Sequence, residues 1–102
     1  MASSKEYLTY VLDLLSSVED ITYRSMMSEY ILYIQGKVLG GIYDDRFLIK
    51  PTKSVLQKIE NPHYELPYQG AKKMVLVDCE DREFIKDLIE AMEPELKKGK
   101  RS

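Results

Sequence analysis

The stretch EYILYIQGKVLGGIYDDRFLIK (Glu29–Lys50) decides the fold class, because short apolar runs alternate in it with turn residues. The runs are rich in β-branched and aromatic residues, which is typical of β-strands. Gln35-Gly36 and Asp44-Asp45 separate the runs, and both dipeptides suit the two-residue turns that join antiparallel strands. Together with the preceding run ITYRSMM (21–27), the pattern predicts four consecutive strands in an antiparallel meander.

Helical patterns flank these four runs. Before them, Ser3 and Glu6 have the spacing of a capping box, and apolar residues follow at helical intervals until Glu19-Asp20. The apolar positions of this first helix are Leu8, Val11, Leu12, Leu15 and Val18. After the runs, Thr52 is a suitable N-cap for a short helix over residues 52–59.

The last third of the chain predicts one more strand and one more helix. The continuous apolar run MVLVD (74–78) is typical of a strand with partners beside it and cover on at least one face. Asp81 is a suitable N-cap for a helix that continues to Met92, and Pro94 is expected to end or kink it. The intervening segment ENPHYELPYQGAKK (60–73) has the prolines and the glycine of a loop.

These elements predict an α+β domain, in which helices pack on an antiparallel sheet of about five strands, in the order αββββαβα. A length of 102 residues suits one domain. We expect this domain to span residues 1–96, and residues 97–102 to form a flexible basic tail.

Composition limits the classes of function. The chain has 15 basic and 17 acidic residues, a net charge of −2, and nucleic-acid binding depends mainly on lysine and arginine at the phosphates. A stand-alone, sequence-specific DNA binder is therefore not expected. One cysteine allows no internal disulfide. The chain has neither an apolar run of the signal-peptide type nor the ~20 apolar residues of a membrane span, so we expect a soluble cytoplasmic protein.

The residues with reactive side chains predict no catalytic, metal or cofactor site. Asp44-Asp45-Arg46 is expected to be a hairpin tip, where both carboxylates point into water and nothing separates their pKa values. Gly40-Gly41 precedes a strand rather than a helix, so a bulge, a bend, or close approach by a helix or a partner is expected instead of a phosphate loop. Cys79 and His63 lack the local signature of a nucleophile pair or metal site.

The strand runs carry apolar residues on both faces of the expected sheet. Strict alternation puts five of them on a second face, opposite the helices: Ile31, Tyr33, Leu39, Tyr43 and Leu48. Exposed apolar surface of this kind marks an interface, here with a protein partner or a second copy of the chain. The other interpretation is that loop 61–73 folds over this face, and the sequence leaves both open.

Nearly the whole chain resembles the N-terminal domain of the TfoX/Sxy family, as a stand-alone domain. The resemblance is carried by YRSMMSEYILYIQGKVLGGIYDDRFLIKPTKS and, downstream, by ELPYQGAKKMVLVD. It implies that several residues are structural parts of the family pattern: Arg24, Met26, Met27, Gly36, Gly40, Gly41 and the strand ending Leu48-Ile49-Lys50.

The resemblance also implies a compact α+β domain with a role in regulating DNA-uptake competence. It offers no catalytic residues. Longer members carry a second, C-terminal helical domain, which we do not expect in a chain that ends at Ser102. The leading hypothesis is a non-enzymatic regulatory module that acts through a protein partner, such as a transcription regulator. The alternative is a small-ligand-binding domain with loop 61–73 as a lid.

Overall fold

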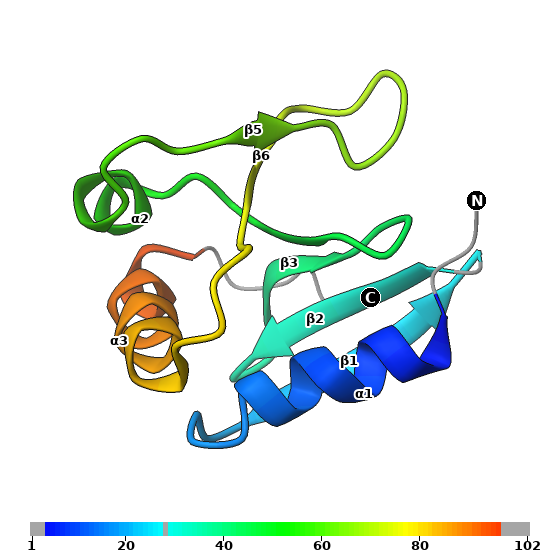
Figure 1. Ribbon diagram of the computed structural model, residues 1–102, viewed down its shortest axis with the longest axis horizontal. Helices are drawn as coiled ribbons and strands as arrows, with labels where there is room; N and C mark the ends of the chain where they lie inside the picture. Colours follow the sequence, from blue (N-terminus) through cyan, green and yellow to red (C-terminus); the bar gives the residue numbers. More distant parts are fainter. Residues whose placement is uncertain (1–3, 28, 97–102) are drawn as a thin grey trace.

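Six strands form one antiparallel sheet in the order β1-β2-β3-β4-β6-β5. The computed structural model describes residues 4–27 and 29–96. Its elements, most of which are labelled in Figure 1, are α1 (Lys5–Leu14), β1 (Ile21–Met26), β2 (Glu29–Ile34), β3 (Lys37–Ile42), β4 (Phe47–Ile49), α2 (Lys53–Lys58), β5 (Tyr64–Glu65), β6 (Met74–Leu76), α3 (Arg82–Met92) and the 3₁₀ turn η1 (Glu93–Glu95). The α+β class and the four-strand meander are therefore confirmed.

The sheet has one more strand than the sequence predicted. β5 is only two residues long and lies within the segment that was expected to be a loop. It pairs with β6, where Tyr64 lies opposite Val75 and Glu65 opposite Met74. A two-residue strand has no periodicity of its own, so only its partner reveals it. β6 lies between β4 and β5, as its continuous apolar run predicted.

Local side-chain caps begin the helices. Thr52 and Asp81 accept hydrogen bonds from backbone N–H groups in the first turns of α2 and α3, as predicted. The cap of α1 is Ser4, whose side chain accepts from the N–H of Tyr7 at 3.1 Å. The predicted cap Ser3 lies outside the described residues. α1 ends at Leu14, earlier than predicted, and α3 ends at Met92 where the Pro94 turn begins.

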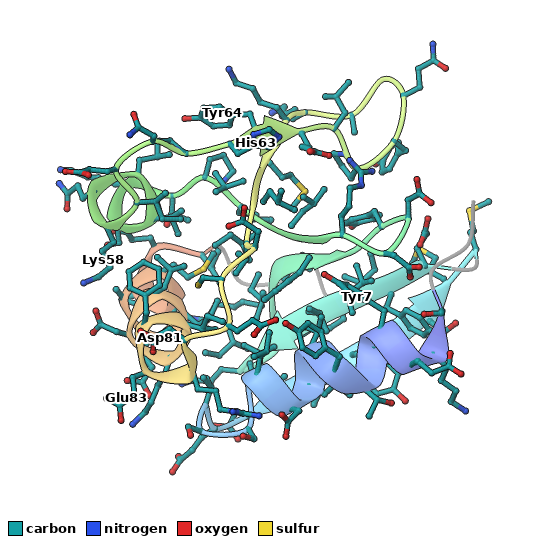
Figure 2. All side chains as sticks on the ribbon, viewed as in Figure 1. Tyr7, Lys58, His63, Tyr64, Asp81 and Glu83 are labelled. Carbon is teal, nitrogen blue, oxygen red and sulfur yellow. The ribbon has the colours of Figure 1, made fainter. Side chains whose placement is uncertain are left out.

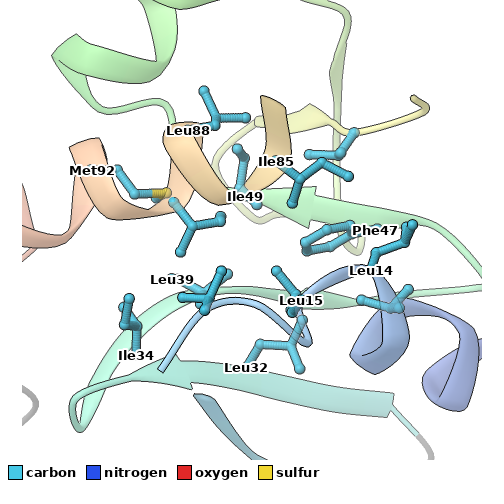
Figure 3. Close-up of a cluster of buried hydrophobic side chains, with 14 of the residues drawn as sticks. Leu14, Leu15, Leu32, Ile34, Leu39, Phe47, Ile49, Ile85, Leu88 and Met92 are labelled. Atoms are coloured by element: carbon cyan, nitrogen blue, oxygen red, sulfur yellow. The ribbon is translucent and has the colours of Figure 1, made fainter. Parts of the chain in front are cut away.

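The three helices pack on one face of the sheet. Figure 3 shows this core, in which side chains from α1 and α3 meet those of β2, β3 and β4. Phe47 is 1% exposed, and Val55 extends the cluster to α2. Leu32, Ile34, Phe47 and Ile49 all point to this face, as the alternation predicted. Burial of such side chains contributes about 1.5–3 kcal/mol each.

A bulge in β3 changes which residues share a face. Leu32 of β2 lies opposite Gly40, but the next residue, Tyr33, lies opposite Val38. Leu39 is therefore an extra residue, and it turns into the core with no exposed surface. The prediction that Leu39 shares a face with Tyr33 is wrong, because that prediction assumed unbroken alternation. Val38 takes this place.

Glycine is required beside the bulge, because the strands approach closely there. A Cβ at Gly40 would clash with the carbonyl oxygen of Leu48. A Cβ at Gly41 would lie 2.6 Å from the carbonyl oxygen of Tyr30 and 2.8 Å from the ring of Tyr43. The expected bulge is confirmed beside this pair, whereas the close approach comes from neighbouring strands and not from a helix or a partner.

Candidate functional site

Asp44 and Asp45 form the tip of the β3–β4 hairpin, as predicted. Both have positive φ, 54° and 57°, which is the backbone of a type I′ turn. Tyr43 and Arg46 close the turn with two backbone hydrogen bonds of 2.9 and 3.0 Å. Asp45 Oδ1 also accepts from the N–H of Ser4 at 2.8 Å, so the tip holds the beginning of α1. These contacts are structural, and both side chains are exposed.

Cys79 and His63 lie in different parts of the molecule. Cys79 is half-buried against the core cluster, and His63 Nε2 contacts Glu65 Oε2 at 2.9 Å. In Figure 2, His63 lies beside β5, well away from Asp81, which follows Cys79 by two residues at the start of α3. Among the described residues no group of three or more histidine, cysteine and carboxylate side chains could hold a metal ion.

The segment after β5 covers one end of the second sheet face. Arg46 forms an ion pair with Glu65 and donates from Nη2 to the carbonyl oxygen of Leu66 at 3.1 Å. The ring of Tyr68 lies 6.2 Å from that of Tyr43, centroid to centroid. Burial raises the pKa of Tyr43, and the hydrogen bond from Arg46, followed by that from His63, lowers the pKa of Glu65.

This cover changes the predicted interaction face. Leu48 is fully buried although it points away from the core cluster, and Tyr43 is only 9% exposed. With Leu39 in the core, these three residues are not available to a partner in this fold. Ile31 and Tyr33 remain half-exposed, beside the half-buried Val38. The open part of the second face therefore lies toward β1 and β2.

Strand β1 forms one edge of the sheet, and five of its six residues are exposed. Two large apolar side chains, Tyr23 and Met26, are 46% and 47% exposed, and Met27 just beyond the strand is 90% exposed. Exposed large hydrophobic side chains in such a group are typical of an interaction surface. The sequence analysis missed this surface, because it treated the first run as an ordinary strand of the meander.

Residues of the family pattern separate into two groups. Gly36 has a φ of 80° in the β2–β3 turn, Gly40 and Gly41 lie at the bulge, and Lys50 is half-buried after β4. Arg24, Met26 and Met27 are instead exposed on and beside the edge strand. Packing within the described domain therefore does not explain this second group.

No helix in the described part of the chain has the length and apolar character needed to cross a membrane. A comparison with solved structures finds none that matches the chain. A protein from Spirochaeta aurantia, described as an uncharacterized 12.7 kDa protein in the trpE 5′ region, is 36% identical over 78 residues. That alignment covers 76% of this chain and 68% of the relative.

The family comparison accounts for most of the fold just described. The model of the TfoX N-terminal domain matches residues 13–91, from the end of α1 to the end of α3. The match includes the whole sheet, the bulge in β3 and the exposed edge strand. The chain therefore belongs to the TfoX N-terminal domain family.

Proposed function

We propose that the chain is a non-enzymatic regulatory module related to the control of DNA-uptake competence, and that it acts by binding a protein partner. The observation that carries the proposal is the exposed edge of β1, which pairs with β2 and with no other strand in the described part of the chain. An edge strand presents unpaired N–H and C=O groups, so an extended segment of another chain can add to the sheet there. The partner is a transcription regulator or a second copy of the chain, and the experiments below separate the two.

The free groups of β1 can be assigned from its register with β2. Ile21 lies opposite Ile34 and Met26 opposite Glu29, without a shift between them. One residue before the strand, the carbonyl oxygen of Asp20 accepts from the N–H of Gln35 at 3.0 Å. Because bonded and non-bonded pairs alternate in antiparallel strands, Tyr23 and Ser25 direct their backbone groups away from β2.

Little opposes addition of a strand at this edge. Within the described residues, β1 contains no proline and one charge, Arg24, and its pairing with β2 has no bulge. Proline, several charges and bulges are the features that protect edge strands from pairing. The exposed Tyr23 and Met26 point to opposite faces of the strand and would contact side chains on either side of an added segment.

Ser25→Pro tests the proposal, with Ser25→Ala as its matched control. Proline removes the outward N–H and obstructs an added strand, but edge strands tolerate it. Tagged wild-type chain should retain a specific protein from an extract of its own cells, Ser25→Ala should retain it equally, and Ser25→Pro should lose it. Sedimentation of the three proteins tests self-association in the same way.

Two outcomes would contradict the proposal. The first is a Ser25→Pro protein with unchanged circular dichroism and melting temperature that still binds the same partner. The second is a wild-type chain that retains no partner and sediments as a monomer at high micromolar concentration. In either case the edge of β1 is not the interaction surface.

We also propose that any effect on transcription passes through that partner rather than through direct reading of DNA. The chain is slightly acidic overall, with a net charge of −2. Non-specific affinity for duplex DNA in the ~0.1 mM range at physiological salt is the expected upper limit. Titration with duplex DNA at two salt concentrations measures it, and tight binding to one sequence would overturn the expectation.

A further inference from the structure

A groove of about 560 Å³ opens on the second face of the sheet, beside the segment that follows β5. Apolar and aromatic side chains form much of its wall, among them Val38, Tyr43, Met74 and Leu96. This volume is in the range that holds a small ligand or a few side chains of a bound peptide. Its lining extends from Val38 in β3 to Met74 in β6, on the side of the sheet away from the β1 edge.

Positive charge gathers at this groove, although the chain as a whole is acidic. Its described lining contains three lysines, Lys50, Lys72 and Lys73. β4 and β6 pair with Ile49 opposite Val75, so Lys50 after β4 and Lys73 before β6 lie at the same end of this pair. Clustered lysines next to an apolar wall favour a partner that carries carboxylates as well as apolar side chains.

The one carboxylate in the described lining, Glu95, is already engaged. It accepts hydrogen bonds from the N–H of Ser54 at 2.9 Å and from Ser54 Oγ at 2.6 Å. Lys73 Nζ lies 4.4 Å from the centre of the Tyr64 ring, which positions this ammonium group without neutralising it. Three lysines against one carboxylate leave the described lining with a positive balance.

We propose that this groove binds an acidic segment of a protein partner. Apolar side chains of the segment contact the half-buried Val38 and Met74, and its carboxylates pair with the lysines. An extended segment suits both features, because alternate side chains point to opposite sides. The inference rests on the proposed function in one respect, that the occupant is part of a protein. It concerns a different surface from β1, and its test does not depend on finding the natural partner.

The test uses a labelled peptide of about ten residues, in which Asp and Glu alternate with Leu and Phe. A second peptide carries Asn and Gln in place of the acids. Fluorescence anisotropy should show saturable binding of the acidic peptide and at least about tenfold weaker binding of the neutral one at low salt. Amide NMR shifts should move at Val38, Tyr43 and Met74, and remain unchanged along β1.

Two variants test the role of the lysines. Lys72→Glu/Lys73→Glu changes the groove, and Lys86→Glu is a control at a single site outside it. Lys86 is exposed on α3 and does not line this groove. The double variant should weaken the acidic peptide by about tenfold or more, and Lys86→Glu by less than about threefold. Lys72→Gln/Lys73→Gln, which removes the charges without adding acids, should weaken it by an intermediate factor.

Several results would overturn this proposal. One is equal binding of the acidic and neutral peptides, and another is the absence of saturable binding by either. A third is a change in amide NMR shifts along β1 alone, which would place the peptide on the edge strand. A fourth is equal binding of benzoate, a single small anion with an apolar ring, because it would make the groove a small-ligand site. The first, second and fourth outcomes do not bear on retention of a partner by the β1 edge.

Discussion

The two faces of the sheet bury their apolar side chains by different means. On one face α1, α2 and α3 cover a continuous core that includes Phe47 and Leu39. On the other face, among the described residues, the segment around Pro67 and Tyr68 covers part of the sheet through a few contacts with Tyr43 and Arg46. The first arrangement supplies most of the stability, and the second leaves a groove and half-exposed residues that a partner can contact.

The largest difference in stability between the two faces is expected from aspartate substitutions at the bulge residue Leu39 and at its neighbour Val38. Leu39→Asp places a carboxylate among fully buried side chains, and we expect it to prevent folding. Val38→Asp introduces the same charge at a half-buried position and should cost only about 1–2 kcal/mol. Circular dichroism and urea unfolding measure both. If Val38→Asp were the more damaging substitution, the bulge would be placed wrongly.

Alanine substitutions of two aromatic residues compare the faces directly. Phe47→Ala should lower the free energy of unfolding by about 3–5 kcal/mol, because it leaves a cavity under the helices. Tyr33→Ala, at a half-exposed position of the second face, should cost about 1 kcal/mol. Urea unfolding of both variants gives the two values. Equal losses would show that the second face contributes to the core as much as the first.

The hairpin tip should tolerate replacement of both of its carboxylates. Asn-Gly in place of Asp44-Asp45 suits the positive φ values of this turn and should gain a few tenths of a kcal/mol. Loss of the hydrogen bond from Ser4 to Asp45 offsets this gain by up to about 1 kcal/mol. The melting temperature should therefore change by only a few degrees. A folded variant that no longer binds the partner would give the tip a functional role.

The smallest expected effect is a change in acid sensitivity at the margin of the groove. Hydrogen bonds from the Ser54 side chain, and next from its N–H, lower the pKa of Glu95 from its ordinary value of 4.5. The folded pKa is the lower one, so the stabilisation is complete above pH 4.5 and is lost as the pH falls through the folded value.

Glu95→Gln should therefore flatten the dependence of stability on pH below 4.5 and leave the dependence at neutral pH unchanged. Urea unfolding across this range gives the slope. Glu90→Gln, on an exposed carboxylate of α3, is the control and should keep the slope of the wild-type chain. A Glu95→Gln protein with the same slope would mean that the Ser54 contact does not form in solution.

Most of the fold followed from local features of the sequence. Thr52 and Asp81 cap their helices, because a side-chain oxygen at that position satisfies free N–H groups nearby in the chain. Gln35-Gly36 and Asp44-Asp45 make the turns that their composition predicted. The candidate site was less predictable. Two of its five predicted residues, Ile31 and Tyr33, keep exposed surface, and the exposed group at Tyr23, Met26 and Met27 was missed.

The sequence by itself determined the starts of α2 and α3, the hairpin turns and the alternation of apolar residues along the strands, because each depends on neighbours within a few residues. Only the tertiary structure decided the bulge that turns Leu39 into the core, the pairing of β5 and the cover over Leu48. These depend on how distant strands align, and a shift of one residue moves a side chain to the opposite face. The tertiary structure also decided that β1 is an edge strand, because the position of a strand in a sheet depends on which other strands pair with it.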